Sequence, residues 1–313
     1  MGGSVNEKTP TIAHHLQYYA LRGAVGALRR LSFKRAGDVG EWLGLLGYRP
    51  IGIRREVVER QLRAVFPGLA DAEVQRIARE SYANLGRTSI EAAVAAGRSA
   101  QELLDLFERV DGWEVVEREY ARGRKVLIVS GHIGNWEIGG AYLSARGFVM
   151  EAVARGMENP LFDRYLTETR RQMGVDIIHD ADAVRRVPRA IREGHVVGFL
   201  FDQGAVGLAS TWVPFLGRYA KTPRGPAVFA LRLNAPIIFA ASLRLPSGRF
   251  HISFEEIVTD RTGDREAAVD RLVQGYSEAL ERVVRRHPEQ YFWQHRRWKH
   301  QRPGTPPELG DPS

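Results

Sequence analysis

The sequence contains no cysteine, which excludes disulfide bonds, thiolate nucleophiles and cysteine-ligated zinc or iron–sulfur centres. Long apolar runs are also missing: Val196–Phe201 and Ala235–Leu243 are far shorter than the ~20 residues that a membrane-spanning helix requires. Met1–Pro10 lacks a basic segment followed by an apolar one, and Asn6 stands where a myristoylation motif needs serine or threonine. We therefore expect a soluble body without a signal peptide. These absences do not exclude contact with a membrane surface.

Lysine is scarce as well, since only 5 lysines accompany 40 arginines in the 313 residues. The 37 acidic residues leave a formal net charge of +8. Arginine binds phosphate through two parallel hydrogen bonds, which suits nucleic acid, a phosphorylated substrate or anionic lipid. A GC-rich genome produces the same bias, and the sign of the charge alone does not choose among these partners.

Helical periodicity dominates the first hundred residues. We predict helices over Ile12–Arg35, Glu56–Phe66 and Ala72–Leu85 and after Ser99, where Glu102 completes a capping box. Apolar positions alternate with arginines in Ile12–Arg35. Such a helix can lie in a membrane interface with its arginines on anionic headgroups, or it can pack on its own domain. The periodicity alone favours packing.

Strand and helix patterns alternate after Arg124. Apolar, β-rich runs predict strands at Val126–Val129, Val196–Phe201, Pro236–Leu243 and Arg249–Val258. Helices are predicted over Pro160–Met173, Asp182–Glu193, Thr222–Leu233 and Ala267–Arg286. Thr222 is expected to cap the third of these helices, with Pro223 as its first residue. The alternation predicts an α/β fold, with a mixed sheet flanked by helices and a helical N-terminal region.

The turn after Val126–Val129 contains His132 and Glu137, five positions apart, together with Gly131 and Gly134. Open α/β sheets place ligands at the carboxyl ends of their strands. Histidine accepts a proton near neutral pH, and a carboxylate on its other ring nitrogen fixes the tautomer. Residues i and i+5 of a helix lie about 140° apart. The two side chains therefore meet only if His132 precedes the helix, which the glycines permit. Alternatively, His132 is a helix cap and Glu137 a surface residue.

Other catalytic signatures are missing. The sequence has no G-x-S-x-G motif, which argues against Ser130 as a nucleophile, and no HExxH, P-loop or G-x-G-x-x-G motif. His179, Asp180 and Asp182 have the residue types of a metal site, but three polar residues in a loop are more often solvated.

The segment Gly131–Glu137 resembles the H-x4-[DE] motif of glycerolipid acyltransferases. Its setting is similar to the bacterial lipid A late acyltransferase family (lauroyl and myristoyl transferases) and to the related phosphatidylinositol mannoside acyltransferases. Further blocks agree with this family, in order along most of the chain: Asn159–Asp163 through Arg171, Phe201–Gln203 leading to Val213–Gly217 and Thr222, Arg232–Ile237, and Tyr291–Lys299. Together these blocks are much more specific than H-x4-E alone.

This resemblance implies a glycerolipid acyltransferase-like fold. It also implies transfer of a fatty acyl chain from a thioester, on acyl carrier protein or coenzyme A, to a hydroxyl of a membrane glycolipid, with a lipid A precursor as the expected acceptor. A phosphatidylinositol mannoside or another polar lipid is the alternative acceptor. The alternative from a different class is a non-catalytic basic protein that binds nucleic acid or an anionic membrane. No helix-turn-helix, RNA-binding aromatic motif or zinc finger supports nucleic-acid binding.

The residue chemistry and the resemblance predict a catalytic pair. His132 would be the general base that deprotonates the acceptor hydroxyl, and Glu137 would orient it. Direct attack on the thioester needs no acyl-enzyme, cofactor or metal. Backbone N–H groups near Gly134, or an arginine, would hold the oxyanion. By family position, the residues expected at the substrate site are Arg170, Arg171, Asp202, Asn135 and Gly134.

Two of these residues have specific expected roles. Arg170 would bind a phosphate of the acceptor or of phosphopantetheine, unless it is a helix-surface arginine. Asp202 would position an arginine or an acceptor hydroxyl, unless it caps the next turn.

The resemblance changes the interpretation of Ile12–Arg35 from a packed helix to an interface anchor. We expect a helical N-terminal region with this membrane-contact helix (1–115), an α/β acyltransferase core (116–300) and a flexible tail (301–313). The expected location is the cytoplasmic face of the bacterial inner membrane, with peripheral or monotopic attachment. Phe215–Gly217 would line an acyl channel or belong to the core. Trp293–Trp298 would face the headgroups or seal the fold.

Overall fold

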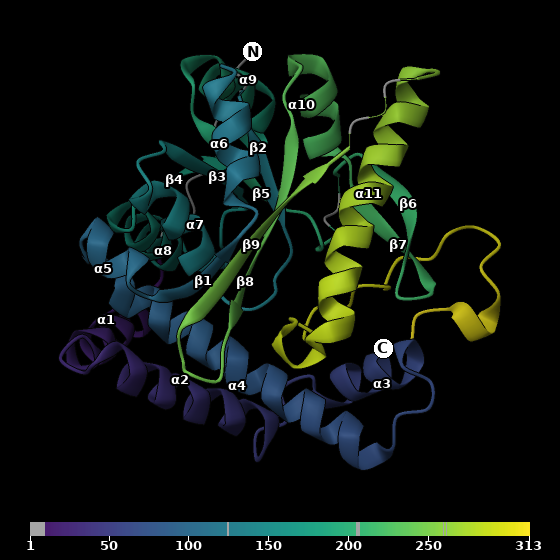
Figure 1. The fold of residues 1–313 in the computed structure, drawn as a ribbon. Coiled ribbons are helices and arrows are strands. Elements are labelled where there is room, and N and C mark those ends of the chain that lie inside the picture. The colour runs from purple at the N-terminus through teal and green to yellow at the C-terminus, as the bar shows by residue number, and fades with distance from the viewer. Residues whose placement is uncertain (1–9, 124, 205–206, 259, 261) are drawn as a thin grey trace.

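The computed structural model describes residues 10–313, apart from 124, 205–206, 259 and 261. The interpretations of Met1–Pro10 therefore concern residues that, except for Pro10, lie outside the described part of the chain. Figure 1 shows the elements in their spatial arrangement, with the sheet at the centre and helices on both of its faces. The predicted α/β class is confirmed.

A seven-stranded, mixed sheet forms the centre of the fold (Figure 1). Its strands lie in the order β1 (Phe107–Asp111), β9 (Phe250–Ile257), β8 (Ile237–Arg244), β2 (Leu127–Ser130), β5 (Val196–Leu200), β3 (Met150–Ala154) and β4 (Val175–His179). β8 and β9 pair antiparallel, and the other neighbours pair parallel. A separate antiparallel hairpin joins β6 (Ser210–Phe215) to β7 (Arg218–Pro223). The four predicted strands begin and end within one residue of β2, β5, β8 and β9.

Alternate residues of β2 face two hydrophobic cores. Leu127 and Val129 lie in the core under α9 (Ala183–Glu193), α10 (Gly225–Leu233) and α11 (Arg265–Arg286). Ile128 lies in the core under α5 (Ala100–Leu104), α6 (Trp113–Ala121) and α7 (Trp136–Ala145). Helix α8 (Pro160–Gln172) packs against β4. Burial on both faces explains why the apolar run of β2 is continuous rather than alternating.

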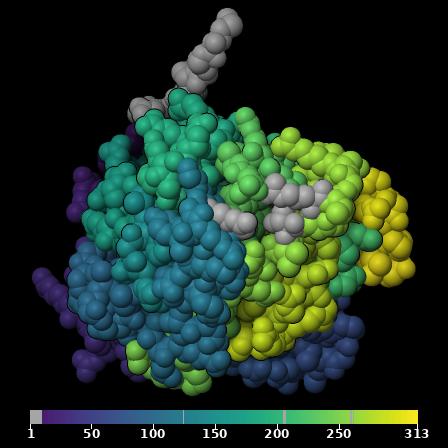
Figure 2. Space-filling view, turned by 45° about the horizontal axis from the view of Figure 1, so that its top comes forward, coloured from purple at the N-terminus to yellow at the C-terminus, as the bar shows by residue number. Residues whose placement is uncertain are grey.

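The N-terminal helices form a layer beneath the carboxyl end of β2 (Figure 1): α1 (Ile12–Leu28), α2 (Phe33–Tyr48), α3 (Arg55–Val65) and α4 (Asp71–Ala95). α2 packs along α4 at very close range, since a Cβ added to Gly44 would lie 2.0 Å from the Tyr82 carbonyl oxygen. In Figure 2 the purple N-terminal helices and the dark-blue segment around α3 border the lower part of the molecule. This layer brings α4 against the turn that follows β2.

Three predicted helices have different bounds in the structure. The helix that was predicted to end at Leu85 continues to Ala95 as α4. Ile12–Arg35 is two helices, because α1 ends at Leu28 and the Ser32 side chain caps α2 by accepting a hydrogen bond from the Arg35 N–H. Thr222 and Pro223 do not begin α10. They end β7, where they pair with Thr211 and Ser210, and Pro226 is the proline of the first turn of α10. Pairing within the hairpin outweighs the local capping signal.

Two structural features bear on the predicted division of the chain into regions: the pairing of β1 and the contacts of the C-terminal tail. β1 precedes residue 116 and pairs with β9, so the first 115 residues contribute a strand to the sheet. The tail is held against the body, because Arg218 Nη1 donates a hydrogen bond to the Gly310 carbonyl (2.9 Å) and Arg296 pairs with Asp311 (2.6 Å). Trp293 and Trp298 are buried and seal the fold. Within the described residues, no helix combines the length and apolar character needed to cross a membrane.

Candidate active site

The turn between β2 and α7 has a backbone that only glycine fits at its centre. Gly134 has φ 60°, and a Cβ there would lie 1.9 Å from the Ser242 carbonyl oxygen of β8. The Asn135 N–H donates to that carbonyl (2.8 Å), and the Gly134 N–H donates to the carbonyl of Gln290 (2.9 Å). Asn135 then caps α7 by accepting from the Ile138 N–H (3.1 Å). These bonds fix the path of the chain on both sides of residue 134.

Helix α4 holds the same turn from below. Asn84 Nδ2 and Thr88 Oγ1 both donate to the Gly134 carbonyl, at 3.0 and 2.9 Å. One turn further along, Glu91 accepts a hydrogen bond from Asn135 Nδ2 (2.8 Å) and forms two bonds of 2.6 Å with Arg244. These hydrogen bonds tie the turn to α4 in the interior, so the turn is rigidly positioned.

His132 forms its side-chain hydrogen bond with Asp202. The Nδ1–Oδ1 distance is 2.7 Å, and the His132 backbone N–H donates to Asp202 Oδ2 at 3.0 Å. The pairing follows from sheet register. Ser130 of β2 is opposite Leu200 of β5, and His132 and Asp202 each come two residues later at the same carboxyl edge. Because adjacent parallel strands end together, their following residues meet.

The hypothesis that Glu137 orients His132 needs correction on this point. Glu137 forms two hydrogen bonds with Arg170 of α8, to Nε at 2.9 Å and to Nη2 at 2.6 Å. Glu137 lies in the first turn of α7, whereas His132 lies before the helix and faces β5. The turn therefore does not bring the side chains of His132 and Glu137 together. The Glu137 carboxylate points instead to the arginine of the neighbouring helix.

Asp202 is ionised in this setting. Burial would raise its pKa, but the attraction of His132 and the two hydrogen bonds from that residue lower the pKa to about 2, with a smaller contribution from the buried Arg297. An ionised carboxylate only accepts hydrogen bonds. The proton of the neutral imidazole therefore lies on Nδ1, and Nε2 is free to accept one. The nearby Tyr291 is buried, and burial followed by the Asp202 charge raises the pKa of its hydroxyl well above the usual value.

Two aromatic side chains lie against the imidazole. The Trp136 ring is edge-on to His132 with 4.9 Å between ring centroids, and the Phe292 ring is tilted with 5.9 Å between centroids. The Phe292 N–H also donates to the His132 carbonyl (3.0 Å). These rings exclude water from the sides of the imidazole, which strengthens its hydrogen bond to Asp202.

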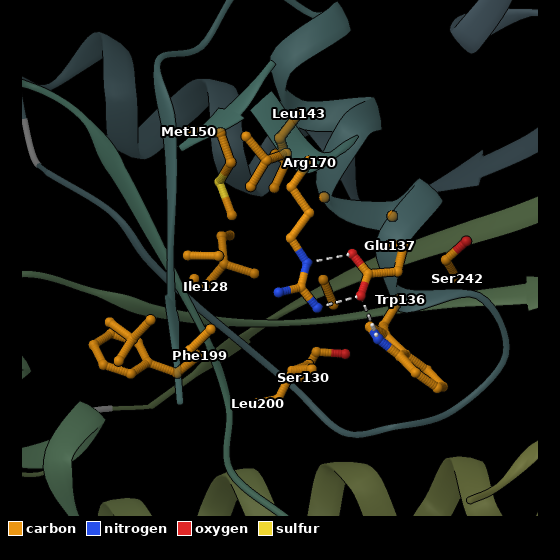
Figure 3. Close-up of a pocket in the computed structure, with 18 of the residues that line it drawn as sticks. Ile128, Ser130, Trp136, Glu137, Leu143, Met150, Arg170, Phe199, Leu200 and Ser242 are labelled. Carbon is orange, nitrogen blue, oxygen red and sulfur yellow. Dashed lines mark hydrogen bonds and ion pairs between the residues drawn. The ribbon is translucent and has the colours of Figure 1, made fainter. Parts of the chain in front are cut away.

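An apolar pocket opens between α7, α8 and the sheet (Figure 3), and its lining includes Trp136, whose ring contacts His132. It encloses about 750 Å³ of space, its open mouth included. Apolar side chains from six strands line most of it, including Ile128, Met150, Ile177, Phe199 and Ile252. Trp136, Glu137 and Arg170 also line it. Figure 3 shows that Arg170 Nη1 points away from Glu137, toward the side of the pocket where Ile128 and Phe199 lie.

The other predicted site residues lie elsewhere. Arg171 faces solvent and pairs with Asp176 and Glu168, both at 3.1 Å. Asn135 is buried as a helix cap. Phe215–Gly217 does not line the pocket, since Phe215 and Leu216 belong to the core on the opposite face of the sheet.

The backbone N–H groups near Gly134 are already used. Those of His132, Ile133, Gly134 and Asn135 all donate to protein oxygens. Of the two oxyanion donors predicted from the sequence, an arginine therefore fits the geometry better than these amides.

Sequence reasoning did not assign Trp136, Phe292, Tyr291 or Arg297 to the site. All four occur in the sequence blocks that resemble the family. Their presence in these blocks is the sequence signal that could have pointed to them. Their proximity to His132 or Asp202 depends on contacts between segments that are distant in the chain, and spacing cannot reveal such contacts.

Glu137→Gln is expected to lower the free energy of unfolding by about 3 kcal/mol, because it leaves the half-buried Arg170 without its counter-charge. Arg171→Gln removes two exposed ion pairs and is the matched control, with an expected loss below about 1 kcal/mol. Urea denaturation of both variants measures the difference. Equal, small losses would show that the Glu137–Arg170 pair does not stabilise the fold.

An α/β fold with a histidine–carboxylate pair and a nearby apolar pocket fits an enzyme whose substrate carries an apolar chain. The model of the bacterial lipid A biosynthesis acyltransferase family matches residues 7–300. The chain belongs to this family and is an acyltransferase. The resemblance identified from the motifs is thereby confirmed.

Three relatives from Escherichia coli (strain K12) illustrate the similarity. The lipid A biosynthesis lauroyltransferase is 25% identical over 309 residues, which cover 96% of this chain and 97% of the relative. The palmitoleoyltransferase is 26% identical over 255 residues (80% and 81%). The myristoyltransferase is 25% identical over 268 residues (85% and 80%).

Proposed function

We propose that this protein transfers a fatty acyl chain from an acyl thioester to a hydroxyl group of a lipid A precursor. In this proposal His132 is the general base, and Asp202, rather than Glu137, is the carboxylate that orients it. The observation that carries the proposal is the 2.7 Å contact between His132 and Asp202 beside an apolar pocket. The names of the relatives, which transfer lauroyl, palmitoleoyl and myristoyl groups in lipid A biosynthesis, support a fatty acyl donor and this acceptor.

The chemistry is a direct acyl transfer. With Nδ1–H bonded to Asp202, Nε2 accepts the proton of the acceptor hydroxyl while its oxygen attacks the thioester carbonyl. The tetrahedral intermediate then collapses, the C–S bond breaks, and the imidazolium returns the proton to the departing thiolate. The ionised Asp202 stabilises the imidazolium between these steps.

The pocket is the proposed site for the acyl chain of the donor. Its apolar lining suits a hydrocarbon, because each buried CH₂ group contributes about 0.8 kcal/mol. Arg170 is the proposed donor to the oxyanion, through the Nη1 group that points into the pocket. Glu137 acts through Arg170, since the ion pair holds the guanidinium in place and the arginine keeps the pKa of Glu137 below its usual value against the effect of burial.

The proposed location is the cytoplasmic surface of the inner membrane, with acyl carrier protein or coenzyme A as the thioester carrier. Three large apolar side chains of α1 are exposed: Ile12, Leu16 and Tyr19. Together with the positive net charge, they fit a helix that lies in the interface of an anionic membrane.

The test is an acyl-transfer assay with acyl carrier protein and coenzyme A thioesters from decanoyl to palmitoyl and a panel of polar lipids that includes a lipid A precursor. The wild type is expected to acylate the lipid A precursor. Failure to acylate this acceptor, with transfer to another lipid in the panel, would overturn the proposed acceptor.

Gly198→Leu is expected to shift the donor preference toward shorter chains. Gly198 lines the pocket, and a Cβ there would meet the end of the flexible Met150 side chain at 2.5 Å, so the larger side chain fills space that a long acyl chain needs. We expect kcat/KM for the palmitoyl donor to fall about tenfold or more relative to the decanoyl donor. Val149→Leu, an exposed substitution outside the pocket, is the control. An unchanged preference in Gly198→Leu would place the acyl chain elsewhere.

A further inference from the structure

A second apolar cavity lies between α2 and α4. It encloses about 960 Å³, its opening included. Its lining is mostly apolar and includes Leu43, Ile53, Tyr82, Leu85, Ile90 and Phe292. We call it the α2–α4 groove. It shares no lining residue with the pocket beside Glu137 and Arg170.

The groove and the pocket both reach His132 through an aromatic ring. Phe292 lines the groove, and its ring centroid is 5.9 Å from that of His132. Trp136 lines the pocket, and its ring centroid is 4.9 Å from that of His132. The two rings are themselves in contact, at 6.4 Å. One aromatic side chain therefore separates the proposed general base from each of two apolar sites.

The mouth of the groove is an exposed apolar surface. Leu43 and Ile53 line the groove and are 44% and 55% exposed, and their neighbours Trp42 and Ile51 are 58% and 67% exposed. These four exposed apolar side chains, two that line the groove and two that neighbour them in the chain, favour contact with lipid over water. Arg54 also lines the groove and supplies a positive charge beside this rim, which complements an anionic headgroup.

We propose that the α2–α4 groove binds a hydrocarbon chain of the acceptor lipid while the pocket holds the acyl chain of the donor. The proposal rests on the proposed function, since two lipidic substrates must meet at His132 and one pocket holds only one of their chains. An acceptor whose hydroxyl reaches Nε2 leaves the bilayer in part. Its exposed CH₂ groups then need an apolar site next to the imidazole. The groove provides that site, and its apolar rim connects it to the membrane surface.

The first test fills the groove. Ser89 lines it from the exposed side of α4, and its hydroxyl donates only to the Leu85 carbonyl of the same helix, so Ser89→Trp adds bulk in the groove without disturbing the core. Acyl transfer to a lipid A precursor in detergent micelles is measured, with Ser89→Ala as the matched control. We expect KM for the acceptor to rise about tenfold or more in Ser89→Trp. KM for the donor and the melting temperature should match those of Ser89→Ala.

The second test compares two exposed isoleucines that are two residues apart. Ile53→Glu puts a charge at the mouth of the groove, whereas Ile51→Glu puts it on the same apolar rim outside the lining. A larger rise of the acceptor KM in Ile53→Glu supports the proposal. Equal effects of the two variants, on KM and on flotation with anionic vesicles, would contradict the groove as a binding site. They would show that this surface only contacts the membrane.

These experiments separate the two proposals. A wild-type protein that does not acylate the lipid A precursor contradicts the proposed function. A wild-type protein that acylates it, together with a Ser89→Trp variant that has an unchanged acceptor KM, contradicts the groove alone.

Discussion

Replacing His132 with alanine is expected to lower kcat for acyl transfer by about 10²- to 10⁴-fold, which is the usual contribution of a positioned general base. The loss arises because no other group in the variant accepts the proton of the hydroxyl at that point. The fold should persist, since the turn is held mainly by backbone contacts of Gly134 and Asn135. Single-turnover acyl transfer and circular dichroism measure the two effects.

The chain provides a matched control for this variant. His195 forms a hydrogen bond of 2.7 Å between its Nδ1 and Glu151, the same length as that between His132 and Asp202, but it precedes β5 at the opposite end of the strand. His195→Ala should leave kcat within a few-fold of the wild type. A folded His132→Ala protein that retains full turnover would rule out His132 as the base.

Asp202→Asn is expected to lower kcat by about 10²-fold or more with little change in KM. The neutral amide neither stabilises the imidazolium nor requires the proton to remain on Nδ1, so part of the population carries its proton on Nε2 and cannot act as a base. Glu137→Gln should reduce kcat less than Asp202→Asn does. The opposite order would restore Glu137 as the residue that orients His132.

Asp202→Asn is also expected to change how the stability of the protein depends on acid pH. The pKa of Asp202 is lowered from 3.8 to about 2 by folding, so its contribution to stability is complete above pH 4 and is lost as the pH falls through 2. A shift of this size corresponds to about 2 kcal/mol. Between pH 6 and pH 2, urea denaturation should therefore show a smaller loss of stability in Asp202→Asn than in the wild type. Parallel curves would show that the charge of Asp202 does not stabilise the fold.

Much of the central fold follows from local patterns. The strands β2, β5, β8 and β9 are long enough or apolar enough to be recognised, and their predicted bounds agree with the structure. The strands β1, β3 and β4 were not predicted, because each is five residues long and carries a charged residue. Their strand conformation is stabilised by pairing with neighbours, which a local pattern does not contain.

The prediction of the site divides in the same way, between local patterns that were recognised and contacts between distant segments that were not. His132 was identified from a histidine in a glycine-containing turn after a buried strand, together with the resemblance of that segment to the family motif. Asp202 was placed at the site by family position, but its pairing with His132 was not predicted, because that pairing depends on which strand lies next to β2. His132 and Asp202 are 70 residues apart in the chain, so a local pattern does not predict their contact. The parallel register of β2 and β5 brings them together.

The sequence by itself determined the α/β class, the absence of cysteine chemistry, the position of the turn that holds the proposed general base and, through its motif blocks, the acyltransferase family. Each depends on composition or on residues close together in the chain. Only the tertiary structure decided that Asp202 pairs with His132, that Arg170 neutralises Glu137, and that each of the two aromatic rings against the imidazole also lines an apolar cavity. These features arise where strands, helices and the closing segment meet, and electrostatic pairing and packing between distant residues select them.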